Sequence, residues 1–216
     1  HKEYRRQRQM CIRDRLYVGG GIIHSKSHKE LYDLATTYNI PVVTTLMGRG
    51  AFPDGHELCL EMPGMHGNYT ATTSIQNSDL LIAIGVRFDD RVTANPDFFA
   101  QNAKVIHADI DPAEIGKVRE AQVPIVGDAK SVLIGLIEAL KGSDLDTASW
   151  INDLKDMKQN FPLSYDQKDD GPLKVPYVLE QLQNLTEEEA VVVSGVGQHQ
   201  MWISQHWNFT KPNTWL

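Results

Sequence analysis

Cysteine is scarce in this sequence, and the two cysteines present, Cys11 and Cys59, form no CxxC pair. Disulfide scaffolds and thiolate metal sites need several closely spaced cysteines, so both classes are excluded. No segment approaches the roughly 18 consecutive apolar residues of a membrane-spanning helix, and no N-terminal signal pattern occurs. We therefore expect a protein of the cytoplasm that makes no use of a membrane.

The chain does contain enough apolar residues for a folded core. It has 216 residues, of which 41% are hydrophobic. At about 100–200 residues per domain, this length corresponds to one domain and part of another. The composition excludes a disordered chain.

Basic residues are concentrated at the N-terminus. Residues 1–15 carry a net charge of +4, whereas the rest of the chain carries −11. A basic arm can bind nucleic acid, but this one lacks apolar periodicity and has no aromatic residue besides Tyr4. We therefore expect no nucleic-acid partner and interpret residues 1–15 as a non-native or misjoined N-terminus.

Short apolar runs alternate with helical patterns from residue 16 to about residue 143. Strands are expected at Leu16–Val18, Ile40–Thr44, Leu80–Val86, Lys104–Ile110 and Val123–Val126, and helices at Ser27–Tyr38, at Tyr69–Gln76 and after Asp128. Ser27 and Glu30 have the spacing of a capping box, and Gly48–Gly67 is expected to be loop with at most a short helix. Near-continuous apolar strands are typical of a parallel sheet covered on both faces. The predicted fold class is α/β, with a doubly wound, mostly parallel sheet and helices on both faces.

The composition changes beyond residue 143. Residues 144–172 are interpreted as a connector, in which Trp150, Leu154 and Met157 mark a helix. A second, truncated α/β unit is expected over 173–216, with a helix at Val175–Leu185, a strand at Ala190–Ser194 and then the segment Gly195–Trp207. About forty residues are too few to bury a core, so this unit should expose apolar surface.

Residues suited to anion binding follow every predicted strand. These strand ends are Gly19-Gly20-Gly21, Thr44 to Gly48, Gly85 to Arg91, Asp109-Ile110-Asp111 and Gly127-Asp128. In a doubly wound sheet, ligands bind at the carboxyl ends of the strands. Glycines let the backbone approach a pyrophosphate, Arg87 or Arg91 can balance its charge, and Asp109 or Asp128 can accept ribose hydrogen bonds. The coincidence of five strand ends predicts a nucleotide site.

Each of these elements alone has a simpler interpretation. Position 24 is His, so the G-x-G-x-x-G dinucleotide fingerprint is absent. Asp109 and Asp128 could be helix caps, and Arg87 with Asp89 or Asp90 could be a surface ion pair. His66 lies between glycines, where it could contact a ligand, and His199 follows Gly195-Val196-Gly197-Gln198, where it could contact a phosphate. No arrangement typical of hydrolytic catalysis is found.

Several longer strings occur in a characteristic order. They are YVGGG at 17–21, TLMG at 45–48, GMHG at 64–67, GVRFDDRVT at 85–93, DID at 109–111 and GVGQHQMW at 195–202. Through these strings the chain resembles, over residues 16–216, the large catalytic subunit of acetolactate synthase (acetohydroxyacid synthase), a family of thiamine-diphosphate enzymes. The resemblance implies a central FAD-binding domain over 16–143 and the start of a diphosphate-binding domain over 173–216.

The resemblance also implies roles for individual residues. Residues that would line FAD are Gly20, Thr45, Leu46, Gly64, Met65, His66, Gly85, Val86, Arg87, Phe88, Asp89, Asp109, Ile110, Asp128 and Ala129. Gln198 and His199 would contact the diphosphate of thiamine diphosphate, and Arg91 would lie near the substrate channel. No catalytic residue of the family falls within this chain, because the activating glutamate and the Mg²⁺ ligands are expected outside it.

The activity implied by the resemblance is the decarboxylation of pyruvate and the transfer of its two-carbon unit to a second 2-oxoacid, pyruvate or 2-oxobutyrate. The products, 2-acetolactate and 2-aceto-2-hydroxybutyrate, belong to branched-chain amino-acid biosynthesis. The implied cofactors are thiamine diphosphate, Mg²⁺ and FAD without net redox role, and the implied partners are further copies of the subunit and a regulatory small subunit. We expect the fragment itself to be inactive. Alternatives are another thiamine-diphosphate carboligase or decarboxylase, or a non-catalytic nucleotide-binding module.

Overall fold

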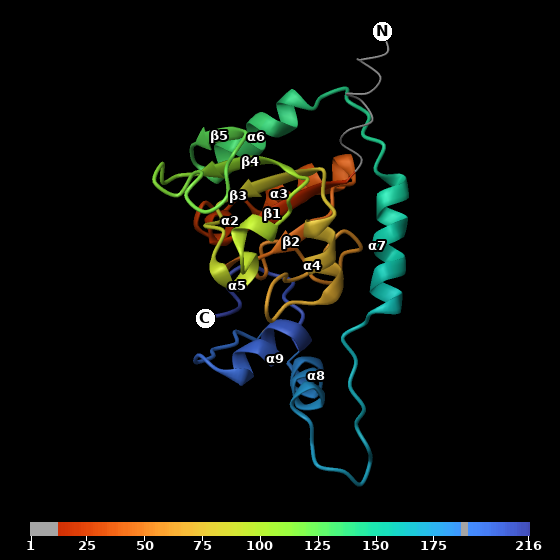
Figure 1. The fold of residues 1–216 in the computed structure, drawn as a ribbon. Coiled ribbons are helices and arrows are strands. Elements are labelled where there is room, and N and C mark those ends of the chain that lie inside the picture. The colour runs from red at the N-terminus through yellow and green to blue at the C-terminus, as the bar shows by residue number, and fades with distance from the viewer. Residues whose placement is uncertain (1–12, 187–189) are drawn as a thin grey trace.

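The computed structural model describes residues 13–186 and 190–216, and a five-stranded parallel sheet forms its centre (Figure 1). The strands are β1 (Asp14–Val18), β2 (Val42–Thr44), β3 (Leu80–Ile84), β4 (Lys104–Asp109) and β5 (Val123–Val126). Their order across the sheet is β2-β1-β3-β4-β5, and every neighbouring pair is parallel. The predicted α/β fold is confirmed. Most of the N-terminal segment 1–15 lies outside the described residues, but Asp14 and Arg15 belong to β1.

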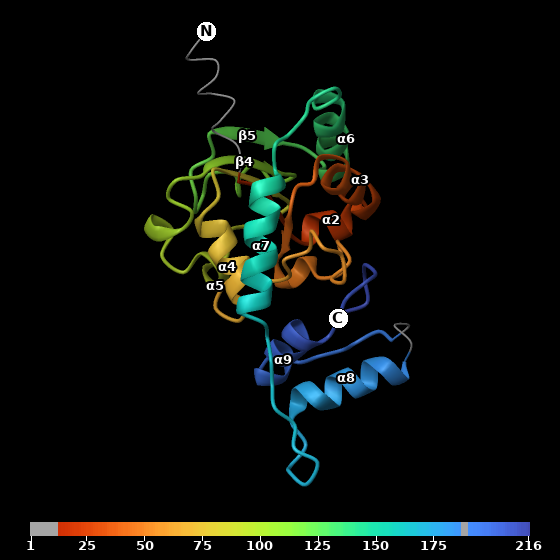
Figure 2. The same cartoon turned by 90° about the vertical axis from the view of Figure 1, so that its right-hand side faces the viewer.

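Alternate residues of the strands face two separate cores. Leu16 and Val18 point to the face covered by α2 (Gly20–His24), α3 (His28–Tyr38) and α6 (Ala129–Ala139). Tyr17 points to the opposite face, which α4 (Tyr69–Gln76) and α7 (Ala148–Asn160) cover (Figure 2). Both faces of β1, β2 and β3 are therefore buried, which explains why these strands read as continuous apolar runs, whereas β5 at the edge of the sheet is mostly exposed.

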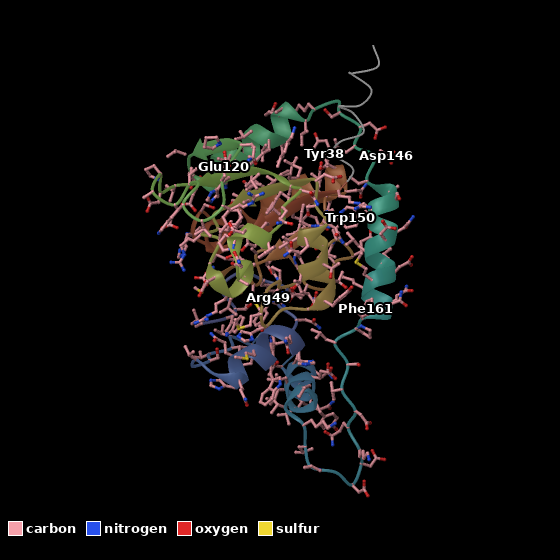
Figure 3. The ribbon with its side chains drawn as sticks, viewed as in Figure 1. Tyr38, Arg49, Glu120, Asp146, Trp150 and Phe161 are labelled. Carbon is pink, nitrogen blue, oxygen red and sulfur yellow. The ribbon has the colours of Figure 1, made fainter. Side chains whose placement is uncertain are left out.

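Helix α7 is part of the second face of the sheet, although the sequence places it in the connector. Trp150 and Leu154 are buried in the same apolar cluster as Tyr17 and Val105. Figure 3 shows Trp150 pointing from α7 toward the sheet. The helix predicted at Trp150, Leu154 and Met157 is confirmed, while the domain boundaries stay a prediction.

The helix caps differ in how far local sequence determines them. The Asp128 carboxylate caps α6 as predicted, accepting from the amides of Lys130 at 3.0 Å and Ser131 at 3.3 Å. The predicted capping box at Ser27 and Glu30 is wrong, because the Ser27 hydroxyl makes no cap hydrogen bond and instead lies 2.7 Å from that of Ser25. Glu30 pairs with Lys130 of α6 at 3.0 Å. A contact between helices thus replaces the local bond.

Short elements complete the loops of the central unit. They are the 3-10 helices η1 (Leu46–Gly48) and η2 (Pro96–Phe98) and the single turn α5 (Asp90–Thr93). The stretch from residue 49 to residue 67 contains no helix, as its glycines and prolines indicated.

The C-terminal unit contains α8 (Val175–Leu185) and α9 (Gln198–His206), which pack against each other. The strand predicted at Ala190–Ser194 is wrong. Among the described residues, this segment pairs only with residues 214–216, through one isolated bridge between Val192 and Trp215, so no ladder develops. Leu185, Val193 and Val196 are largely exposed, which confirms the expected apolar surface.

Candidate functional site

The strand order places a topological switch between β1 and β3. From β1 the chain moves to β2 on one side, and β3 then pairs on the other side. In such sheets the connections leave the carboxyl edge in opposite directions and open a crevice between the two strands. The segments after β1 and β3 are Gly19-Gly20-Gly21 and Gly85 to Arg91, so the predicted site lies at this switch point.

Gly19, Gly21 and Gly85 interlock at the switch point. The Gly19 amide donates to the Ile84 carbonyl and the Gly21 amide to the Gly85 carbonyl, both at 3.2 Å. A Cβ on Gly19 would lie 2.4 Å from the Gly85 oxygen, closer than real Cβ contacts allow. Gly85 also has φ +61°, a left-handed conformation that favours glycine. These three glycines are required by backbone packing.

Gly20 is the glycine of this group with space around it. The atoms nearest to a Cβ there would be the Met47 Cβ at 3.4 Å, the Met47 carbonyl oxygen at 3.6 Å and the His24 Cδ2 at 3.8 Å, all at ordinary contact distance. Beside it, the Thr45 hydroxyl is buried and finds no hydrogen-bond partner among the described residues. Leu46 is half-buried, and Met47 is mostly exposed. The ends of β1 and β2 therefore offer a backbone cradle, a free hydroxyl group and apolar surface.

The loop after β3 is held to the sheet by Phe88. Its ring contacts Tyr17 and His107 edge-on, at centroid distances of 5.5 and 5.0 Å. A hydrogen bond of 2.9 Å between His107 Nε2 and the Val86 carbonyl also holds this loop to the sheet. Burial raises the pKa of the Tyr17 hydroxyl well above its usual range. A rigid aromatic base thus supports an exposed loop.

The charged side chains of that loop face solvent. Arg87 lies 3.8 Å from Asp89, and Arg91 lies 3.8 Å from Asp90, with all four side chains at least half exposed. The Arg91 backbone amide donates to Asp89, and this hydrogen bond lowers the pKa of the Asp89 carboxyl group. Ion pairs this exposed contribute little stability. Because the Arg87 and Arg91 side chains are exposed, both guanidinium groups are accessible to an anion.

The Gly64-Met65-His66 segment lies against the same loop. The Met65 amide donates to the Arg91 carbonyl at 2.9 Å. Gly64 has φ +96°, and a Cβ there would lie 2.5 Å from the Arg91 oxygen. The structure therefore brings two separate predicted segments together.

Asp109 and Asp128 lie at the ends of neighbouring strands. The Asp109 carbonyl accepts from the Gly127 amide at 2.9 Å, and its carboxylate accepts from the Asp111 amide at 2.9 Å. Asp128 caps α6, whose first residue, Ala129, is buried, whereas Ile110 is 72% exposed. The capping interpretation of Asp128 is correct, and each carboxylate makes local hydrogen bonds at the edge.

Gln198 and His199 are exposed at the start of α9. The preceding Gly197 has φ +153° and provides no side-chain cap, so the helix start is open. A Cβ on Gly197 would lie 3.1 Å from the His199 ring. The far end of α9 reaches the central unit, where Gln205 Nε2 donates to the His66 carbonyl at 2.8 Å.

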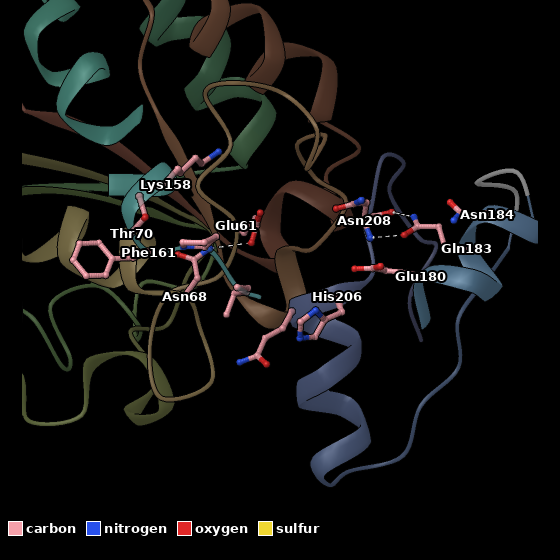
Figure 4. A pocket seen from close by; sticks show the side chains of 13 residues that line it. Glu61, Asn68, Thr70, Lys158, Phe161, Glu180, Gln183, Asn184, His206 and Asn208 are labelled. Carbon is pink, nitrogen blue, oxygen red and sulfur yellow. Dashed lines mark hydrogen bonds between the residues drawn. The ribbon is translucent and has the colours of Figure 1, made fainter. Parts of the chain in front are cut away.

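A cleft of about 680 Å³ lies between the two units (Figure 4). Its lining includes Glu61, Asn68, Lys158, Gln183 and His206, which come from well-separated parts of the chain. Local sequence offers no signal for such a grouping. Gln183 is used to hold Asn208, donating to its carbonyl at 2.8 Å and accepting from its amide at 3.0 Å. Burial lowers the pKa of His206.

Sequence reasoning also missed the buried ion pair between Arg49 and Asp54, whose closest atoms are 2.7 Å apart. Its only local signal is two opposite charges five residues apart in a loop. Burial raises the pKa of Asp54 to about 6, and the adjacent Arg49 opposes that shift. Arg49 is labelled in Figure 3.

Two classes of site or segment are absent from the described residues. Within 13–186 and 190–216, no three His, Cys, Asp or Glu side chains are grouped to hold a metal ion. No helix in these two ranges combines the length and the apolar character needed to cross a bilayer.

The fold and the edge together define a doubly wound α/β unit with a switch-point crevice, the class of domain in which nucleotide sites are common. Residues 13–136 match the family model described as thiamine pyrophosphate enzyme, central domain. The chain belongs to this family.

Similar curated proteins carry a more specific name. The chain is 54% identical to the acetolactate synthase of Mycobacterium leprae and 52% identical to the acetolactate synthase large subunit of Corynebacterium glutamicum, each over 93% of this chain and 33% of the relative. It is 46% identical to a chloroplastic acetolactate synthase of Arabidopsis thaliana, over 93% of this chain and 30% of the relative. The chain thus spans about a third of the length of these relatives.

Proposed function

We propose that this chain is a part of an acetolactate synthase large subunit, with the central domain over 16–143 and the start of the thiamine-diphosphate-binding domain over 173–216. The observation that carries this proposal is the identity of 52–54% to two bacterial acetolactate synthases over 93% of the chain. Its whole protein would convert pyruvate, with a second pyruvate or 2-oxobutyrate, to 2-acetolactate or 2-aceto-2-hydroxybutyrate.

The carboxyl edge of the sheet fits FAD in its donor and acceptor chemistry. Gly20 leaves room for a pyrophosphate near the backbone, and the buried Thr45 hydroxyl has no hydrogen-bond partner within residues 13–186 and 190–216. Arg87 is an accessible cation, and Ile110 and Met65 are exposed apolar side chains suited to a flat ring. The proposed FAD-lining set is Gly20, Thr45, Leu46, Gly64, Met65, His66, Gly85, Val86, Arg87, Phe88, Asp89, Asp109, Ile110, Asp128 and Ala129.

The start of α9 fits a phosphate group. It is an uncapped helix N-terminus behind a glycine, with Gln198 and His199 exposed beside it. These two residues would hold the diphosphate of thiamine diphosphate, a cofactor that supplies an electron sink for decarboxylation. The exposed Arg91 would attract the carboxylate of the 2-oxoacid. In this proposal FAD is structural, Mg²⁺ is held by residues outside this chain, and further copies and a small subunit are partners.

Flavin binding tests the edge directly. We expect this chain to quench FAD fluorescence with low affinity, because part of the family's flavin site lies in another domain. Asp109→Ala should weaken the binding about tenfold, or about 1.4 kcal/mol. The matched control is Asp33→Ala, on the exposed face of α3, which should bind as the original chain does. Binding indifferent to Asp109→Ala would remove Asp109 from the site.

Activity tests the wider proposal. A protein extended to the length of the relatives should form acetolactate from pyruvate without taking up oxygen, whereas the 216-residue chain should form none. Oxygen uptake or a different product would favour another thiamine-diphosphate enzyme. A natural stop codon directly after Leu216 would favour a non-catalytic nucleotide-binding module.

A further inference from the structure

The loop of residues 49–54 contains a buried ion pair and contacts the C-terminal unit. Arg49 and Asp54 are each 5% exposed, and Arg49 Nη2 donates to Asp54 Oδ2 at 2.7 Å. A buried ion pair is destabilising to break, because the remaining charge loses its partner. The pair therefore holds this loop in one conformation.

Phe209 docks on this loop from the C-terminal unit. Its backbone amide donates to Asp54 Oδ2 at 2.6 Å, and its carbonyl accepts from the Asp54 amide at 3.1 Å. The Phe209 ring is buried, stacks on Trp215 at 5.0 Å, and lies 5.5 Å from the Arg49 guanidinium. One carboxylate thus binds both the arginine of its own loop and the backbone of a segment 155 residues away.

The backbone of the loop also fits the C-terminal segment closely. Gly50 has φ +80°, and a Cβ there would lie 2.2 Å from the Lys211 carbonyl oxygen. Phe209 follows α9, which ends at His206 with Trp207 as its C-cap. The contacts that hold Phe209 on the loop therefore also restrict the position of the C-terminal end of α9.

Arg49 extends this connection to the carboxyl edge of the sheet. Its Nη1 donates to Thr44 Oγ1 at 3.4 Å, and Thr44 is the last residue of β2. Thr45 follows it and belongs to the proposed nucleotide site. A single guanidinium group thus contacts the edge, the loop and the docked aromatic ring.

We propose that Arg49 and Asp54 are positioning residues, which fix α9 on the central unit in register with the carboxyl edge. This proposal rests on the proposed function in one respect, the binding of diphosphate by Gln198 and His199, the first residues of α9. The pair would set where the diphosphate-binding start of α9 lies relative to the nucleotide edge.

Hydrogen exchange of the 216-residue chain tests this docking without any cofactor. Asp54→Asn removes the charge, so amides of residues 203–216 should exchange at least tenfold faster, while those of β1 and β3 stay protected. Thr44→Val removes the contact of Arg49 with the edge and should speed exchange in the same segment by a smaller factor. The control, Asp156→Asn on the exposed side of α7, should change neither.

The exchange pattern separates positioning from general destabilisation. Unchanged exchange over 203–216 in Asp54→Asn would overturn the proposal, as would equal acceleration over the sheet and the C-terminal segment. The hydrogen-exchange experiment uses no flavin, so its result does not depend on FAD binding. A chain that binds no FAD would contradict the proposed function but not the positioning role of Arg49 and Asp54.

Discussion

Gly21 and Gly85 meet backbone to backbone at the point where β1 and β3 separate. A Cβ on Gly85 would lie 2.5 Å from the Gly21 Cα, and a Cβ on Gly21 would lie 2.6 Å from the Gly85 Cα. The two strand ends can approach this closely only because neither residue carries a side chain. The shape of the candidate site therefore depends on a glycine pair before any ligand is considered.

Gly85→Ala should destabilise the central unit by more than about 3 kcal/mol, because it adds a backbone clash to an unfavourable positive φ. Urea unfolding followed by circular dichroism measures this change. Gly135→Ala in α6 is the control, since a Cβ there meets nothing within 4 Å. It should stabilise the helix by up to about 1 kcal/mol. Equal effects of the two variants would contradict the packing role of Gly85.

Phe88→Ala should cost about 3–5 kcal/mol, because Phe88 is 2% exposed and its ring packs on Tyr17, Phe99 and His107. Thermal unfolding provides the measurement. Phe98→Ala is a matched control ten residues along, where the ring is 67% exposed, and should change stability by less than about 0.5 kcal/mol. A Phe88 variant as stable as the Phe98 variant would show that the aromatic base does not hold the loop.

Trp150→Ala should destabilise the central unit by about 3–5 kcal/mol, although the residue lies in the predicted connector. The indole is buried against the sheet, and the Arg15 guanidinium lies 4.6 Å from its ring. Guanidinium unfolding of both proteins would measure the loss. Phe161→Ala, just beyond the end of α7, removes a half-exposed ring and should have a much smaller effect. A negligible effect of Trp150→Ala would indicate that α7 acts as a linker and does not stabilise the central unit.

Asp14 should make stability depend on pH. Burial, with repulsion from Asp79, raises the pKa of its carboxyl group from 3.8 to about 6, against the attraction of Arg15. Between these pH values the folded state binds more protons than the unfolded state, so stability should fall as pH rises through this window. Asp14→Asn should remove the part of that fall that comes from Asp14, leaving the part that comes from Asp54, whose pKa is also raised to about 6, and should raise stability at pH 7 by the order of 2 kcal/mol.

Urea unfolding at pH 4 and at pH 7 checks the Asp14 prediction. The control Asp33→Asn, on the exposed side of α3, should keep the pH dependence of the original chain. An unchanged pH dependence in Asp14→Asn would exclude Asp14 as its source.

Most of the helices and strands follow from local sequence. The limits of α4, β5 and α8 agree with the residue patterns, because apolar periodicity and caps such as Asp128 act over a few residues. The strand predicted at Ala190–Ser194 fails for the opposite reason. Its residues have strand propensity, but a strand also needs a neighbour to pair with, and within the part of the chain that the structure describes it pairs only with residues 214–216.

The candidate site was predictable as a set of strand ends, since parallel strands bring their carboxyl ends to one edge. Their contacts were not predictable. The sequence cannot show that Gly64 lies against Arg91, because chain folding over a long loop decides this. The sequence likewise cannot show that the Arg49–Asp54 pair contacts Phe209, which lies far from it in the chain.

The sequence by itself determined the α/β class, the family resemblance and the residues that gather at the carboxyl edge, because each depends on short patterns and on the direction of parallel strands. Only the tertiary structure decided that Gly19, Gly21 and Gly85 serve backbone packing, that α7 covers a face of the sheet, and that Asp54 holds Phe209. These relationships join residues far apart in the chain. They arise from close packing and from the burial of charge, which no local pattern encodes.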